Sequence, residues 1–206
     1  VFATNGMVAT SHPLAAATAI DILKAGGNAA DAAIAAAVLL GICEPQMTGI
    51  GGDMFALVQK DPASEVVALN GSGRAPLAAN AAALRDAGHG TVPLHSVDAV
   101  TIPGAMDGFC TLAKDFGALP LKETLAPAIH YARAGVPVAP KVAFDWAQNT
   151  QALQGSARDT YLTAGAAPKL GQLFAAPGQV EVLERVAAEG RDGFYTGAVA
   201  EDMQAS

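Results

Sequence analysis

The run AADAAIAAAVLL, residues 29–40, constrains the fold more than any other part of the chain. Asp31 is its one charged residue, so a helix formed here is apolar on every face and belongs in a protein interior. Asn28 precedes the run and can cap such a helix, and Asp31 lies near the positive end of the helix dipole. The sequence therefore predicts a buried helix, packed between a sheet and a further layer.

Elements of both kinds are predicted around this helix. Residues 7–10 have the pattern of a short strand, and a helix is predicted at 14–25, with Ser11 as its N-cap and glycines at its end. Residues 54–60 and 65–70 are apolar runs separated by DPAS, which indicates a β-hairpin. Helices followed by a hairpin favour the α+β class, with helices layered on a largely antiparallel sheet.

The second half of the chain has a different character. Helices are predicted at 121–134, 141–154, 179–189 and 197–205, and no strand pattern stands out. We therefore divide the chain into residues 1–95, with the first helices and the hairpin, and residues 96–206, a mainly helical part.

Composition excludes several classes of partner. Of 206 residues 51% are apolar and 15% charged, the net charge is -7, and no basic cluster occurs, so neither nucleic acid nor an anionic membrane is an expected partner. The longest apolar run, 32–43, is too short to span a bilayer. The chain begins without the pattern of a signal peptide, which favours the cytoplasm, although a removed signal peptide would allow the periplasm.

No cofactor or metal is expected. Cys43 and Cys110 lie in apolar segments without metal-ligand spacing and are interpreted as buried thiols. His89, His95 and His130 also lack such spacing.

The stretch GICEPQMTGIGGDMFALV, residues 41–58, raises the question of a phosphate-binding loop. Phosphate loops lead from a strand into a helix N-terminus, whereas this loop leads from a helix into a strand. Close backbone packing is therefore the favoured reason for its glycines. Asp53 within it is interpreted as a turn residue rather than a ligand, and His12 as a helix cap rather than a catalytic base.

Several segments together resemble one known family. The chain opens with GMVATSHPLAAATAIDILKAGGNAADAAIAAAVLLGICEPQMTGIGGDMFALV, and TIPGAMDGF, LAPAIHYARAGVPV and EGRDGFYTGAVAEDM follow in order. This series is similar to the large subunit of the γ-glutamyltranspeptidase family, and the resemblance covers nearly the whole chain.

The resemblance implies a fold and a mechanism. Members are N-terminal nucleophile hydrolases with a four-layer αββα sandwich, and their precursor cleaves itself into a large and a small subunit. The N-terminal threonine of the small subunit then attacks a small-molecule amide. Because this chain begins with Val1, we expect no catalytic residue within it. The implied partner is the small subunit, in a heterodimer or a dimer of heterodimers.

One position departs from the family pattern. Family members that act on γ-glutamyl groups carry an arginine before an Ala-Pro pair, and aligning Ala75-Pro76 places Ser72 at that position. Arg74 lies two residues later and, in an extended segment, would face the same side, where its guanidinium can pair with a carboxylate. Alternatively, Arg74 caps a turn or pairs with a surface acid, and Ser72 is a turn residue.

This departure makes γ-glutamyl specificity doubtful. The resemblance also covers members that act on oxamate or on side chains of cephalosporin-type compounds, and a non-catalytic binding homologue is a further alternative.

Overall fold

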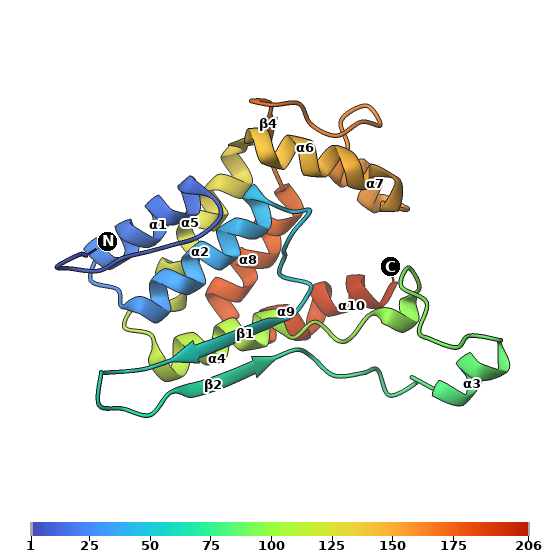
Figure 1. The fold of residues 1–206 in the computed structure, drawn as a ribbon, viewed down its shortest axis with the longest axis horizontal. Coiled ribbons are helices and arrows are strands. Elements are labelled where there is room, and N and C mark those ends of the chain that lie inside the picture. Colours follow the sequence, from blue (N-terminus) through green and yellow to red (C-terminus); the bar gives the residue numbers. More distant parts are fainter. Residues whose placement is uncertain (1, 206) are drawn as a thin grey trace. The chain divides into compact units, whose positions relative to one another are not determined.

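The computed structural model describes residues 2–205, which form short β-strands and a larger number of helices (Figure 1). In chain order the elements are α1 (Pro13–Lys24), α2 (Ala29–Cys43), β1 (Met54–Val58), β2 (Val67–Gly71), α3 (Ala81–Asp86), η1 (Val97–Ala99), α4 (Ala105–Phe116), α5 (Leu121–Ala134), β3 (Val136–Pro137), α6 (Pro140–Asn149), η2 (Thr150–Ala152), α7 (Ser156–Tyr161), β4 (Leu173–Phe174), α8 (Pro177–Glu189), α9 (Asp192–Tyr195) and α10 (Gly197–Ala205). The predicted α+β class is confirmed.

The described residues divide into two units. Residues 2–49 and 109–205 form the first, and residues 50–108 form the second, so the boundary predicted near residue 95 falls inside the second unit. No helix among residues 2–205 is long and apolar enough to cross a membrane.

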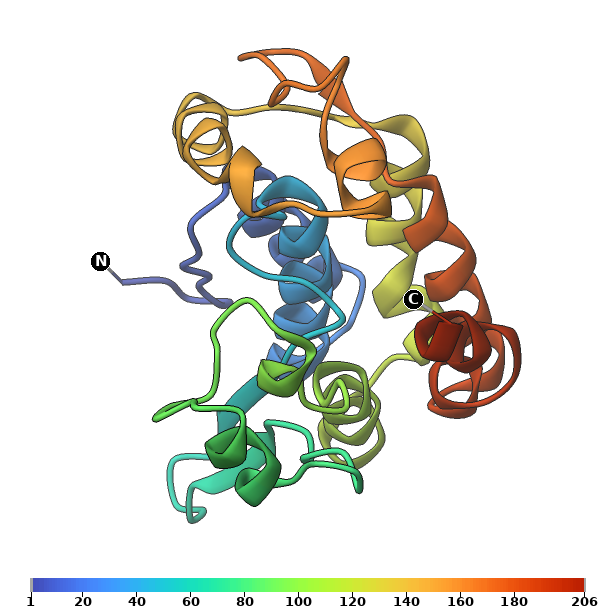
Figure 2. The ribbon, with the colours of Figure 1, turned by 90° about the vertical axis from the view of Figure 1, so that its right-hand side faces the viewer.

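The first unit is built around α2. As predicted, this helix is buried along its length, with Ile34, Leu39 and Ile42 fully enclosed. It packs between α1 and α5, and α5 packs in turn against α8, so the four helices lie side by side in Figures 1 and 2. Alanines dominate the contact between α1 and α2, because small side chains let two helix backbones approach closely.

A buried carboxylate fixes the start of α2. Asn28 caps the helix through its side-chain oxygen, and Asp31 accepts a hydrogen bond from the backbone N–H of Asn28 at 2.9 Å, which completes a capping box. Asp31 also accepts from the backbone N–H of Ala118 at 2.9 Å, in the segment after α4. Asp31 thus has a structural role, because it ties the segment after α4 to the start of α2.

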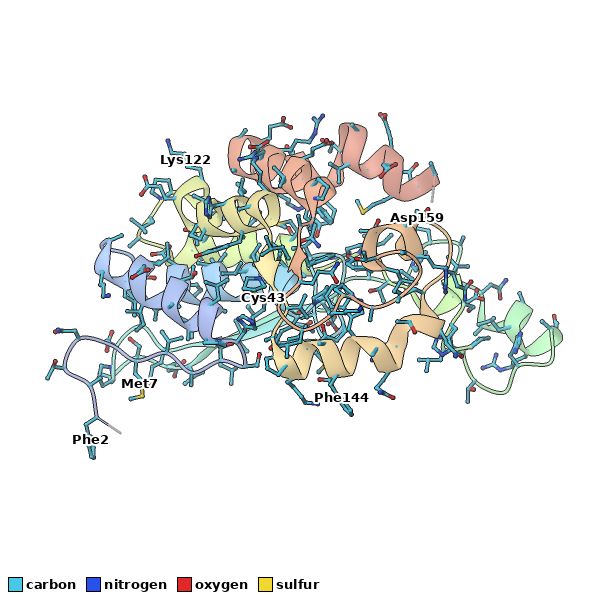
Figure 3. The ribbon with its side chains drawn as sticks, turned by 90° about the horizontal axis from the view of Figure 1, so that it is seen from above. Phe2, Met7, Cys43, Lys122, Phe144 and Asp159 are labelled. Carbon is cyan, nitrogen blue, oxygen red and sulfur yellow. The ribbon has the colours of Figure 1, made fainter. Side chains whose placement is uncertain are left out.

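The rest of the first unit has an aromatic cluster of its own. The ring of Trp146 on α6 lies 4.8 Å from that of Phe174 on β4 and 6.3 Å from that of Tyr161 on α7. Trp146 is 3% exposed. In contrast, Phe144 on the same helix points outward, as Figure 3 shows. α6 therefore packs through one face only.

The second unit contains the predicted hairpin. β1 and β2 pair antiparallel, with Met54 opposite Gly71 and Val58 opposite Val67. On one face of β1, Phe55 and Leu57 are 65% and 77% exposed. On the other face Met54 packs against Gly108 of α4, where a Cβ atom would lie 2.5 Å from the sulfur of Met54.

Three predicted details are wrong. Residues 7–10 are extended but pair with no strand in the described part of the chain. The N-cap of α1 is His12, whose Nδ1 accepts from the backbone N–H of Leu14, rather than Ser11. Cys110 is half-buried rather than buried.

Candidate functional site

The segment after β2 carries the two candidate substrate-binding residues, Ser72 and Arg74. β2 ends at Gly71, and the side chain of Asn70 accepts a hydrogen bond from the backbone N–H of Ser72 at 3.0 Å. This is an Asx turn, in which an asparagine side chain replaces a backbone acceptor. Ser72 is half-buried, and its hydroxyl lies 3.5 Å from the carbonyl oxygen of Gly73. The geometry therefore fits a turn residue.

The conformation of Gly73 shows that the extended geometry expected for this segment is wrong. Its φ is +75°, a conformation that residues with a side chain rarely adopt. The chain is therefore not extended from Ser72 to Arg74, and strand alternation does not place their side chains on one face.

Arg74 is exposed and presents its guanidinium to solvent. Among residues 2–205 its side chain has neither an ion pair nor a hydrogen bond. Its carbonyl oxygen, however, accepts a hydrogen bond from the backbone N–H of Ile102 at 2.9 Å. Within residues 2–205 no contact supports the interpretation of Arg74 as a turn cap or as part of a surface ion pair.

TIPGAMDGF was predicted only as part of a resemblance, yet Thr101, Ile102 and Gly104 contact the turn that carries Ser72 and Arg74. The hydroxyl of Thr101 donates to the carbonyl oxygen of Ser72 at 3.4 Å. The glycines in both segments were the available signal, because paired glycines permit two backbones to approach closely.

The glycine-rich loop has the geometry predicted for it. α2 ends at Cys43 and β1 begins at Met54, so the loop leads from a helix into a strand. Gly41 packs against Gly49, where a Cβ atom on Gly41 would lie 3.3 Å from the Cα of Gly49. The carbonyl oxygen of Gly52 accepts hydrogen bonds from the backbone N–H groups of Gly104 and Ala105, each at 3.0 Å. Close backbone packing is confirmed.

The remaining polar candidates are helix caps, are exposed or have a hydrogen-bond partner. His12 caps α1, as predicted. Asp53 and His130 are exposed, and Glu44 accepts a hydrogen bond from the hydroxyl of Ser11. Burial raises the pKa of the Cys43 thiol to about 12, with a further contribution from the charge of Glu44. Within the described residues no group of three His, Cys, Asp or Glu side chains could hold a metal ion.

Comparison with known proteins decides the family. The family model of the gamma-glutamyltranspeptidases matches residues 15–206. The chain belongs to the γ-glutamyltranspeptidase family. The resemblance stated from the sequence is thereby confirmed.

Within the γ-glutamyltranspeptidase family the chain is similar to proteins that are named for different activities. It is 35% identical over 98% of its length to the glutathione hydrolase-like YwrD proenzyme of Bacillus subtilis (strain 168), covering 38% of that protein. It is also 35% identical over 97% of its length to the oxamate amidohydrolase proenzyme of Klebsiella pneumoniae, covering 39% of it. The chain thus spans about two fifths of these curated relatives.

A solved structure of this family shows the same fold. The cephalosporin acylase from Bacillus halodurans superposes on the whole chain with a TM-score of 0.92 at 42% identity, and the chain covers 40% of it.

Proposed function

We propose that this chain is large-subunit sequence of an amide-cleaving enzyme of the γ-glutamyltranspeptidase family. The observation that carries the proposal is the family match over residues 15–206 together with relatives whose names mark them as proenzymes. The reactive hydroxyl belongs to the N-terminal threonine of a small subunit, released when the precursor cleaves itself. The two subunits form a heterodimer or a dimer of heterodimers.

The chemistry follows from the properties of an N-terminal threonine. Its own α-amine takes the proton from the hydroxyl, which then attacks the amide carbonyl carbon. Backbone N–H groups hold the resulting oxyanion. The C–N bond breaks, the leaving amine accepts the proton, and an acyl ester remains on the threonine. Water or an amino acid then accepts the acyl group.

The substrate class follows from Arg74. Its guanidinium is exposed and lacks a partner among residues 2–205, and a guanidinium pairs with a carboxylate through two parallel hydrogen bonds. We assign it to a carboxylate on the acyl side of the amide. Ser72, at the position of the family arginine, lines the same turn. Oxamate and cephalosporin-type acyl groups that bear a carboxylate meet this requirement, and Ser72 in place of the family arginine counts against a γ-glutamyl group.

The exposed apolar face of the hairpin is an argument for the small subunit as a partner. A two-stranded hairpin is at best marginally stable in water, and burial of an apolar sheet face is a main source of stability. Phe55 and Leu57 are largely exposed on one face of β1. Further strands of the αββα sandwich, supplied in part by the small subunit, cover this face.

The test uses the complete processed enzyme and two chromogenic anilides with the same leaving group. Glutaryl p-nitroanilide carries a carboxylate on its acyl part, and valeryl p-nitroanilide does not. For Arg74→Ala we expect kcat/KM for the glutaryl compound to fall by about 10–100-fold, the scale of losing a charged hydrogen bond worth roughly 1.5–3 kcal/mol. We expect kcat/KM for the valeryl compound to stay unchanged in this variant.

Arg85→Ala is the matched control. Arg85 is an exposed arginine of the same unit, on α3. Its replacement leaves both rates unchanged. Equal rates for the Arg74→Ala variant and the parent enzyme on the glutaryl compound would remove Arg74 from the substrate site.

A further inference from the structure

The segment Thr101–Gly104 lies directly against the turn that carries Arg74. The hydroxyl of Thr101 donates to the carbonyl oxygen of Ser72, 29 residues earlier, at 3.4 Å. The backbone N–H of Ile102 donates to the carbonyl oxygen of Arg74 at 2.9 Å. The two hydrogen bonds hold the chain on both sides of Gly73, the residue with positive φ.

Glycines make this approach possible. A Cβ atom on Gly73 would lie 2.0 Å from the carbonyl oxygen of Ile102. A Cβ atom on Gly104 would lie 2.3 Å from both the carbonyl oxygen of Gly71 and the backbone nitrogen of Gly73. No side chain fits at either distance, so the sequence specifies the contact from both segments.

The same segment is anchored at its other end. The backbone N–H groups of Gly104 and Ala105 both donate to the carbonyl oxygen of Gly52, just before β1. Thr101–Gly104 is therefore bonded to the residues that precede β1 and to those that follow β2. This arrangement fixes the ends of the hairpin relative to each other.

Backbone contacts determine the point from which the Arg74 side chain leaves the main chain. The guanidinium has no partner of its own among the described residues, so the hydrogen bond to its carbonyl oxygen and the turn before it determine where the side chain begins. An arginine that binds a carboxylate through two parallel bonds tolerates little misplacement.

We propose that Thr101 is a positioning residue for substrate binding, which acts through the Ser72–Arg74 backbone and does not touch the substrate. This inference rests on the proposed role of Arg74. The hydrogen bond from the Thr101 hydroxyl stabilises the turn, and Gly104 leaves the space that lets the two segments approach each other. Loss of the hydroxyl loosens the turn, and the grip on an acyl-side carboxylate weakens while the attacking group elsewhere is unchanged.

A double-mutant cycle on the complete processed enzyme tests the proposal. Thr101→Val removes the hydroxyl and keeps the shape. We expect kcat/KM for glutaryl p-nitroanilide to fall by about 3–10-fold, mainly through KM, on the scale of one lost hydrogen bond. Valeryl p-nitroanilide turns over as before, and Thr101→Ser restores the glutaryl rate. In an Arg74→Ala background Thr101→Val has no further effect, because the two residues act on one contact.

The controls separate this inference from the proposed function. Thr91→Val, an exposed threonine of the same unit, leaves both rates unchanged. A Thr101→Val loss that is equal for both substrates, or that persists without Arg74, overturns the positioning role. If Arg74→Ala lowers the glutaryl rate and Thr101→Val does not, only this inference fails. If Arg74→Ala has no effect, the assigned substrate contact fails, and the positioning role fails with it.

Discussion

Asp31 accepts a hydrogen bond at 2.9 Å from the backbone N–H of Ala118, a residue 87 positions later in the chain. The carboxylate is fully buried and also accepts from the N–H of Asn28 at 2.9 Å and of Leu119 at 3.4 Å. One side chain thus satisfies donors from two distant segments. Replacing such a group lowers stability, because each buried N–H donor that loses its acceptor keeps its desolvation cost without a hydrogen bond to offset it.

The first prediction concerns this carboxylate. Asp31→Asn replaces an acceptor oxygen with an NH₂ group that faces backbone donors. We expect the free energy of unfolding to fall by about 1–3 kcal/mol, measured by denaturant unfolding followed by circular dichroism. Asp115→Asn, at an exposed position near the end of α4, is the control and should change it by less than about 0.5 kcal/mol. Equal stability of the two variants would contradict the structural role of Asp31.

The second prediction explains a glycine in the EGRDGFYTG stretch. A Cβ atom on Gly193 would lie 2.6 Å from the carbonyl oxygen of Arg185 and 2.9 Å from the nitrogen of Val186. These are backbone atoms of α8 and cannot move aside. Gly193→Ala should therefore lower the free energy of unfolding by about 1–3 kcal/mol.

Gly178 offers a matched comparison for Gly193. It lies in the first turn of α8, and a Cβ atom there would meet no atom within 4 Å. Gly178→Ala should raise stability, by at most about 1 kcal/mol, because alanine loses less backbone entropy in a helix than glycine does. A stability change of the same sign in both variants would rule out the steric account.

The third prediction concerns the thiol of Cys43. The residue is buried, with 2% of its surface exposed. Burial disfavours the thiolate and raises the pKa to about 12. At pH 8 the thiol is therefore almost entirely protonated, with about one molecule in ten thousand as the reactive thiolate.

Iodoacetamide labelling of a Cys110→Ser variant measures this directly. At pH 8 Cys43 of the native protein should remain unlabelled over hours, and in guanidinium Cys43 should react fully. The thiolate fraction, and with it the labelling rate, should rise about tenfold for each pH unit and level off only near pH 12. Rapid labelling of Cys43 in the native protein at pH 8 would show that the thiol is exposed and that its pKa is not raised.

The local elements of this fold could be predicted from the sequence, because their signals are local. Asn28 and Asp31 predict the start of α2, and Leu121–Ala134 is confirmed as α5 with the predicted bounds. Both helices have clear capping or termination residues. Ser11 was the expected cap of α1, but the neighbouring His12 takes that role through its ring nitrogen.

The long-range contacts could not be predicted in the same way. α4 went unpredicted as a helix because Gly108 interrupts its pattern, and that glycine is explained only by Met54, which packs against it. Likewise, nothing near Arg74 in the sequence indicates that Thr101 and Ile102 bond to its turn. Ser72 and Arg74 were found by comparison with a family pattern, and the positive φ of Gly73 then changed the geometry expected for them.

The central claim is that the reactive hydroxyl lies outside this chain, on the N-terminal threonine of a small subunit. Intact-mass analysis and N-terminal sequencing of the purified complete protein, after brief exposure to glutaryl p-nitroanilide, test it most directly. We predict two polypeptides, the smaller beginning with threonine and carrying the added acyl mass. A single uncut polypeptide that still hydrolyses the amide, or an acyl group bound to a residue of this chain, would contradict the account.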